Sequence, residues 1–214
     1  MKLYFNGGLS KGNFGNYWAS QCGNPRGFIG KIVTWAMNRA NSVMYRGIIT
    51  KLKPHDSMKL LDIGFGNGYL EKLIYKQAKC QIEGVDISED MVNVATKNNK
   101  EAVSKGKVHF AIGDCCDWAF DDLSFDVVTT MNTIYFGEDT IKGLKEIHRV
   151  LKEKGVFYNA VLTKESLDKV FYTKNGFKKF EDEEYVQMGK EAGFSHISIT
   201  RLGHKYGMLI EYKK

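Results

Sequence analysis

Two patterns of apolar residues divide the chain near Pro54. Between residues 28 and 52, apolar positions recur at the three- and four-residue spacing of a helix with one buried stripe. That stripe consists of Ile29, Ile32, Val33, Ala36, Met37, Ala40, Val43, Met44, Ile48 and Leu52. We therefore expect one long helix or two short helices before Pro54.

After Pro54, short apolar runs alternate with helix-like segments, which is typical of a parallel sheet with helical connections. Strands are predicted at residues 59–63, 81–85, 108–112, 125–131 and 156–162, and helices at 68–77, 89–104 and 140–151. Gly155 is expected to make the tight turn into the fifth strand.

The carboxy-terminal part follows a polar and aromatic stretch at residues 163–180. A helix is predicted at 182–192, and strands at 196–201 and 208–212 are close enough to pair as a hairpin. No internal repeat or linker interrupts this region. Residues 54–214 are therefore expected to form one core with an insertion at about 163–181.

Composition supports a single globular domain. The chain has 214 residues, 43% apolar and 26% charged, which is enough for one continuous core without metals or disulfides. Its four cysteines lack the spacing of a metal knuckle or a disulfide framework. No stretch resembles a secretion signal or a membrane span, so we expect a cytoplasmic protein, monomer or homodimer.

The net charge of +6 results from 31 Lys and Arg against 25 Asp and Glu. Most lysines are scattered among acidic residues along helical stretches, which indicates a solvated surface. The charge balance permits an anionic partner but does not require one.

The segment at residues 60–70 carries the strongest chemical signal. An apolar strand runs into Gly64, Gly66 and Gly68 and then into a helix, which is typical of a nucleotide-binding turn. The spacing Gly-x-Gly-x-Gly differs from the Gly-x-Gly-x-x-Gly of dinucleotide sites. Asp62 before the loop would attract an ammonium group and repel a pyrophosphate. We therefore expect a ligand that carries a positive charge and no phosphate.

Two further carboxylates follow the next strands. Asp86 ends the second strand, at about the interval at which an acidic residue binds ribose hydroxyls, and Ile87 follows it. Asp114 comes directly after the third strand, where its carboxylate can accept a hydrogen bond from an adenine amino group. Three acidic strand ends in succession predict one cleft.

The order of these segments resembles a class I S-adenosylmethionine-dependent methyltransferase from about Lys59 to the end of the chain. The resemblance includes Phe-Asp-Val-Val at 125–128 and the stretch 146–155, although the family usually has a proline and two glycines where Glu153, Lys154 and Gly155 stand. It implies a Rossmann-like, seven-stranded, mostly parallel α/β sheet with helices on both faces and a last strand antiparallel in a C-terminal hairpin.

The resemblance also implies a cofactor, S-adenosyl-L-methionine, with S-adenosyl-L-homocysteine as product. By this likeness the three glycines surround the methionine part, while Asp86 binds ribose, Asp114 with the Cys115 amide holds adenine, and Met91 packs on the base. Residues expected at the methyl group and the acceptor follow the fourth strand: Asn132, Thr133 and Tyr135.

The amino-terminal part is similar, less specifically, to the leading helices of the ubiquinone and menaquinone methyltransferase group. By that likeness residues 1–53 form a tail and a helical cap over the cofactor, with Tyr17 and Trp18 above the pocket. Tyr17 and Tyr135 are the candidates for assisting proton removal from an acceptor. The alternative is that Tyr17 and Trp18 are surface aromatics of a tail.

Three functions remain open on the sequence. The first is methyl transfer to a small-molecule acceptor, because the chain has little beyond the core, a cap and one insertion. The second is methylation of a nucleic acid such as RNA, although residues 131–135 lack the Asn-Pro-Pro-Tyr pattern of amino-methylating enzymes. The third is a non-catalytic protein that binds the cofactor. No metal is expected.

Overall fold

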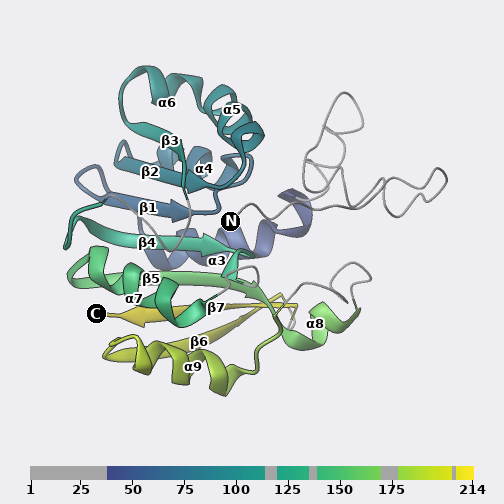
Figure 1. Cartoon of the computed structure of the whole chain (residues 1–214). Helices are drawn as coiled ribbons and strands as arrows, with labels where there is room; N and C mark the ends of the chain where they lie inside the picture. Colours follow the sequence, from purple (N-terminus) through teal and green to yellow (C-terminus); the bar gives the residue numbers. More distant parts are fainter. Residues whose placement is uncertain (1–37, 114–119, 135–138, 170–177, 204–205) are drawn as a thin grey trace. The chain divides into compact units, whose positions relative to one another are not determined.

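The computed structural model describes residues 38–113, 120–134, 139–169, 178–203 and 206–214. Its centre is a seven-stranded sheet in the order β3-β2-β1-β4-β5-β7-β6 (Figure 1). The strands are β1 (Lys59–Ile63), β2 (Gln81–Asp86), β3 (Val108–Ile112), β4 (Phe125–Met131), β5 (Leu151–Leu162), β6 (His196–Leu202) and β7 (Gly207–Lys213). The first five are parallel, and β7 runs antiparallel to both β5 and β6. This arrangement confirms the expected fold class.

Helices cover both faces of the sheet (Figure 1). They are α3 (Ser42–Leu52), α4 (Tyr69–Gln77), α5 (Glu89–Asn98), α6 (Lys100–Ser104), α7 (Thr140–Val150), α8 (Lys164–Lys169) and α9 (Asp182–Glu191). Tyr158 of β5 faces α3, where its hydroxyl donates to the Lys51 carbonyl. Phe157 faces the opposite side and lines a small cavity with residues of α7. Neighbouring residues of a strand thus pack under different helices, as the alternation of a pleated sheet requires.

Helix α3 belongs to the compact unit that contains the sheet, which spans Asn41–Lys214. It buries Met44, Ile48 and Leu52 in the core, three members of the predicted stripe. We predicted from the sequence that the core begins after residue 53, because Pro54 ends the helical pattern. Proline ends the helix but not the core, since α3 packs against β4, β5, β6 and β7.

The prediction that Gly155 forms the turn before the fifth strand is wrong. Strand β5 begins at Leu151, directly after α7, and Gly155 lies inside it. Lys154 has a φ of 65°, and the pairing with β4 shifts register at this point, which marks a β-bulge. A Cβ on Gly155 would lie 2.8 Å from the Lys152 carbonyl oxygen. The glycine is therefore explained by close packing of main chains rather than by a turn.

The predicted helix at 89–104 is divided at Asn99 into α5 and α6. The Asn99 amide nitrogen donates to the carbonyl oxygens of Gly68 and Ala95, at 2.9 and 3.0 Å. The short helix α8 was not predicted, because its sequence is polar with a single buried residue, Leu167.

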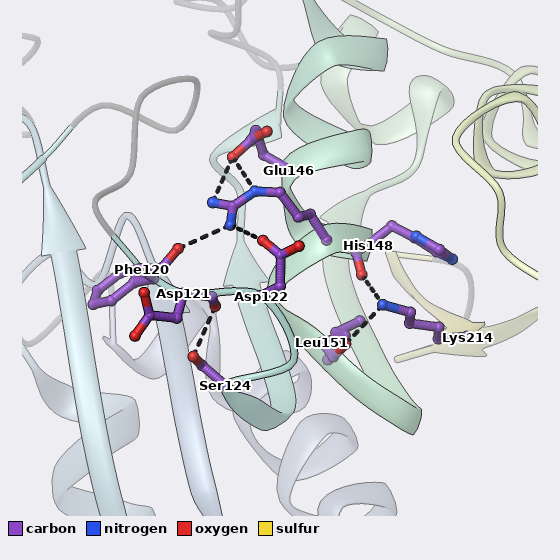
Figure 2. Close-up of polar contacts among 9 residues, drawn as sticks. Phe120, Asp121, Asp122, Ser124, Glu146, His148, Leu151 and Lys214 are labelled. Carbon is purple, nitrogen blue, oxygen red and sulfur yellow. Dashed lines mark hydrogen bonds and ion pairs between the residues drawn. The ribbon is translucent and has the colours of Figure 1, made fainter.

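The segment leading into β4 is fixed by Arg149 of α7, whose partners Phe120, Asp122 and Glu146 are labelled in Figure 2. Its guanidinium donates to the Phe120 carbonyl at 2.9 Å and to Asp122 at 2.5 Å. Two further nitrogens of the same group donate to Glu146 at 2.9 and 3.0 Å. Lys214 donates to two carbonyl oxygens at the end of α7. These contacts lie at the amino edge of the sheet, where β4 begins.

In the part of the chain that the structure describes, no helix is long and apolar enough to cross a bilayer.

Candidate functional site

The glycine-rich loop joins β1 to α4 at the carboxyl edge of the sheet. Gly64, Gly66 and Gly68 have φ values of 71°, 56° and 72°. Residues other than glycine rarely adopt this left-handed backbone conformation. The Gly64 amide donates to the Val85 carbonyl of β2 at 2.7 Å. The loop therefore turns sharply above the junction of β1 and β2.

The surroundings of the three glycines differ. A Cβ on Gly64 would lie 2.3 Å from the Thr133 hydroxyl oxygen, and one on Gly68 would lie 2.6 Å from the Asn99 amide nitrogen. A Cβ on Gly66 would meet no atom of the described residues within 4 Å. Gly64 and Gly68 are thus required by packing, whereas Gly66 borders open space that a ligand can use.

Asp86 lies beside this opening at the end of β2. One carboxylate oxygen accepts the Gly66 amide and the other accepts the Ser88 amide, both at 3.0 Å. Burial raises the pKa of Asp86, and these hydrogen bonds oppose the rise. Each oxygen has a second lone pair, so the carboxylate can also accept ligand hydroxyls.

Apolar side chains flank Asp86. Ile87 is 71% exposed, and Ile112, which pairs with Asp86 from β3, is 61% exposed. Met91 is half-buried and packs against the core. The two isoleucines form an apolar surface at the ends of β2 and β3, of the kind that a planar base can cover.

Asp62 lies one strand away in β1 and is buried. Its carboxylate accepts the Thr129 hydroxyl at 2.5 Å. Glu71 of α4, which the sequence reasoning missed, is fully buried and lies close enough to Asp62 for the two carboxyl groups to shift each other's pKa. Burial raises the pKa of Asp62 to about 6 and holds the pKa of Glu71 well above its usual range. The carboxyl groups of Asp62 and Glu71 are thus both buried away from solvent.

The end of β4 supplies the other side of the site. Asn132 has a φ of 56°, and its amide donates to the Ala160 carbonyl at 2.9 Å. Its side chain donates to the Asn41 side-chain oxygen at 3.4 Å, just before α3. Thr133 lies against Gly64, so the segment expected at the reaction centre contacts the glycine loop.

Five of the expected site residues lie outside the described residues: Tyr17, Trp18, Asp114, Cys115 and Tyr135. Of the others, Asp86 accepts the Gly66 amide and Thr133 lies against Gly64. Asp62, Ile87 and Asn132 are close to these residues along the chain, and Met91 packs against the core. Across the residues that are described, no group of three or more His, Cys, Asp or Glu side chains is arranged to hold a metal ion.

Two asparagines also support the loop, and the sequence analysis did not identify them. Asn98 donates to the Asn67 carbonyl and Asn99 to the Gly68 carbonyl, both at 2.9 Å. These contacts span 31 residues, so no local spacing reveals them. They tie the loop to the end of α5 and hold its carbonyl groups away from the opening.

Comparison with known proteins agrees with this geometry. Residues 61–159 match the family model described as a methyltransferase domain. Demethylmenaquinone methyltransferase of Bacteroides fragilis is 37% identical over 111 residues, which are 51% of this chain and 45% of that protein. The chain therefore spans about half the length of that relative.

Two other matches extend further along the chain. A putative methyltransferase of Bacillus subtilis, YrhH, is 29% identical over 155 residues, which are 72% of this chain and 78% of that protein. The solved structure of a putative S-adenosyl-L-methionine-dependent methyltransferase from Methanococcus maripaludis has a TM-score of 0.70, with 23% identity, and the alignment covers 97% of each chain. The fold, the glycine loop and these matches agree: the chain is similar to class I S-adenosylmethionine-dependent methyltransferases, in sequence over residues 61–159 and in fold over most of its length.

Proposed function

We propose that this protein binds S-adenosyl-L-methionine and transfers its methyl group to a small-molecule acceptor. The observation that carries the proposal is that two neighbouring strands, β1 and β2, bring the carboxylates of Asp62 and Asp86 to the two ends of the glycine loop: Asp62 precedes Gly64, and Asp86 accepts the Gly66 amide. A ligand with an ammonium group and a vicinal diol matches that pair, whereas a pyrophosphate would be repelled by both.

In this proposal each part of the cofactor meets a different strand end. Asp86 accepts the ribose hydroxyls, and Asp62 attracts the ammonium of the amino-acid part. Ile87 and Ile112 offer their exposed apolar surface to adenine. Asp114 and the Cys115 amide hold adenine by family resemblance, and Met91 supports the base from the side of the core.

The chemistry that the cofactor supplies is a sulfonium whose methyl group leaves readily to a nucleophile. The protein's contribution is to align acceptor, methyl and sulfur for in-line displacement, which can contribute about 7 to 11 kcal/mol. Asn132 and Thr133 border the place where the methyl would lie, next to Gly64. Tyr135 and Tyr17 remain our candidates for assisting proton removal.

Two observations favour a small-molecule acceptor over a nucleic acid. A relative named demethylmenaquinone methyltransferase acts, by its name, on a small molecule. Residues 131–135 also lack the Asn-Pro-Pro-Tyr pattern that amino-methylating enzymes carry after the fourth strand. We therefore propose a metabolite as substrate.

Calorimetry with S-adenosyl-L-methionine and S-adenosyl-L-homocysteine tests cofactor binding. Transfer of labelled methyl from the cofactor to a metabolite extract, with and without nuclease treatment, tests the reaction. We expect binding of both compounds and nuclease-resistant labelling of small molecules. Absence of binding overturns the proposal. Binding without transfer indicates the non-catalytic alternative, and nuclease-sensitive labelling indicates a nucleic-acid substrate.

A further inference from the structure

Glu71 is a buried carboxyl group that the proposed function does not yet use. It lies in the first turn of α4, three residues after Gly68, and its side chain is fully buried. Among the described residues, no donor from another residue reaches either of its carboxyl oxygens. A bare carboxylate in such a place is costly, because it loses its hydration and gains no hydrogen bond.

The groups that face Glu71 make ionisation still less favourable. Asp62 of β1 and Asp86 of β2 both act on it with negative charge. From α3, the Tyr45 phenol lies close enough to interact with Glu71 and Asp62, and its ring packs edge-on against Tyr69 at 5.1 Å. These neighbours offer Glu71 no cation.

Asp62 and Glu71 nevertheless lie close enough for each carboxyl group to shift the pKa of the other, as a hydrogen bond between them would. Two carboxylates have no hydrogen between them, so such a bond requires a proton on one partner. Asp62 also accepts the Thr129 hydroxyl, which favours its charged form. Glu71 has no comparable donor, so it is the partner that keeps the proton.

We propose that Glu71 is a positioning residue: a protonated carboxylic acid that donates a hydrogen bond to Asp62 and keeps that carboxylate ionised and oriented toward the ligand's ammonium group. This inference rests on the proposed function, because it assigns the ammonium-binding role to Asp62. Glu71 itself is buried behind Asp62 and does not touch the ligand.

The test compares two ligands that share a nucleoside but differ in the amino-acid part. S-adenosyl-L-homocysteine carries the ammonium group, and 5′-methylthioadenosine does not. The ratio of their affinities, measured by calorimetry from about pH 5 to about pH 8, isolates the contribution of Asp62 from that of Asp86. In the natural protein we expect this ratio to rise as Asp62 ionises.

Two substitutions then separate the possibilities. Glu71→Gln keeps a neutral donor, so the pH midpoint of the ratio should move by less than about half a unit. Glu71→Leu removes the donor, so the midpoint should rise by about one unit, and the ratio should fall about twofold at pH 7 and nearly tenfold at about pH 5. Binding of 5′-methylthioadenosine should change less than about twofold, which shows that the variant is folded.

The opposite result is equally specific. If Glu71 were ionised, Glu71→Gln would remove a negative charge beside Asp62 and lower the midpoint, which overturns the inference even if Glu71→Leu does not fold. An unchanged midpoint in folded Glu71→Leu overturns it as well. If the natural protein binds neither ligand, the proposed function fails instead.

Discussion

The Asp86 carboxylate accepts the Gly66 amide at 3.0 Å, so the side chain expected to bind ribose also fixes the middle of the glycine loop. The two residues are 20 positions apart, and the bond closes the turn from β1 across to β2. The ligand-binding carboxylate and the loop thus form one unit, and disturbing either should disturb both.

Asp86→Ala should therefore weaken binding of S-adenosyl-L-homocysteine about a hundredfold. It removes two charge-assisted hydrogen bonds to ribose, each worth roughly 1.5 kcal/mol, and frees the Gly66 amide. Calorimetry gives the affinity. A matched control is Asp56→Ala, which removes a similar bond to the Lys79 amide at 2.7 Å, at the amino edge of the sheet. Equal affinity in Asp86→Ala and the natural protein would contradict this role.

A second prediction compares two glycines that share a left-handed backbone conformation, one in the glycine loop and one away from it. Gly66 and Gly106 have φ values of 56° and 64°, and within the described part of the chain a Cβ on either would have no neighbour within 4 Å. Alanine at each should cost roughly 1 to 2 kcal/mol of stability, because left-handed backbone disfavours a side chain. Only Gly66→Ala should also reduce ligand binding. Urea unfolding and calorimetry on both variants give the comparison.

If Gly106→Ala weakened binding as much as Gly66→Ala, the effect would come from general destabilisation. The opening at Gly66 would then have no special part in the site.

The fold was largely predictable because its signals are local. Strands β1, β3 and β4 have the expected ends, since each is an apolar run bounded by polar or glycine residues. The early start of β5 was not predictable, because Lys152, Glu153 and Lys154 do not read as a strand. Pairing of Leu151 with Phe125 across the bulge extends the strand, and that contact is long-range.

The site was predictable for the same reason, and only in part. Asp62 and Asp86 could be identified from the sequence, because each is an acidic residue near the end of a predicted strand and Asp62 directly precedes the glycine loop. Glu71 carries no such mark, because glutamate in the first turn of a helix usually interacts with the helix dipole at the surface. Its burial depends on the packing of α3, which brings Tyr45 over the same position. Tertiary packing therefore decides the chemistry of Glu71.

A third prediction concerns pH and Asp62. Because burial raises its pKa to about 6, the folded state binds a proton that the unfolded chain releases nearer the ordinary value of 3.8. Asp62 therefore favours folding below that ordinary value, and this stability is lost as the pH rises toward about 6. Relative to the natural protein, Asp62→Asn should gain roughly 1 to 3 kcal/mol across this window and lose ligand binding. Urea unfolding at several pH values measures the difference.

Asp126 provides a control, because its pKa is lowered in the folded protein whereas that of Asp62 is raised. Although partial burial opposes the shift, hydrogen bonds from Lys152 and the Lys59 amide lower the pKa of Asp126. Its stabilisation is thus present above the ordinary value and lost in acid, as the pH falls through the lowered pKa. Asp126→Asn should be less stable at neutral pH by an amount that hardly changes from about pH 5 to about pH 8. A parallel response of the two variants would show that the Asp62 effect is not specific.

A fourth prediction tests the bulge in β5. A Cβ on Gly155 would approach the main-chain oxygens of Lys152 and Asp126 to 2.8 and 3.2 Å, and main chain cannot move aside as a side chain can. Gly155→Ala should cost about 2 kcal/mol or more of unfolding free energy, in the range of overpacked core positions. Thermal or urea unfolding of the variant measures this cost.

Gly143 in α7 is the matched position, because none of the residues that the structure describes would lie within 4 Å of a Cβ there. Gly143→Ala should stabilise the protein by roughly 0.5 to 1 kcal/mol, since alanine restricts the unfolded chain and suits a helix. Opposite signs at the two glycines would show that close main-chain packing, and not the loss of glycine as such, determines the cost at the bulge. If Gly155→Ala proved neutral, β5 would have to accommodate a side chain at the bulge, and its pairing with β4 around Phe125 and Val127 would differ from the register found here.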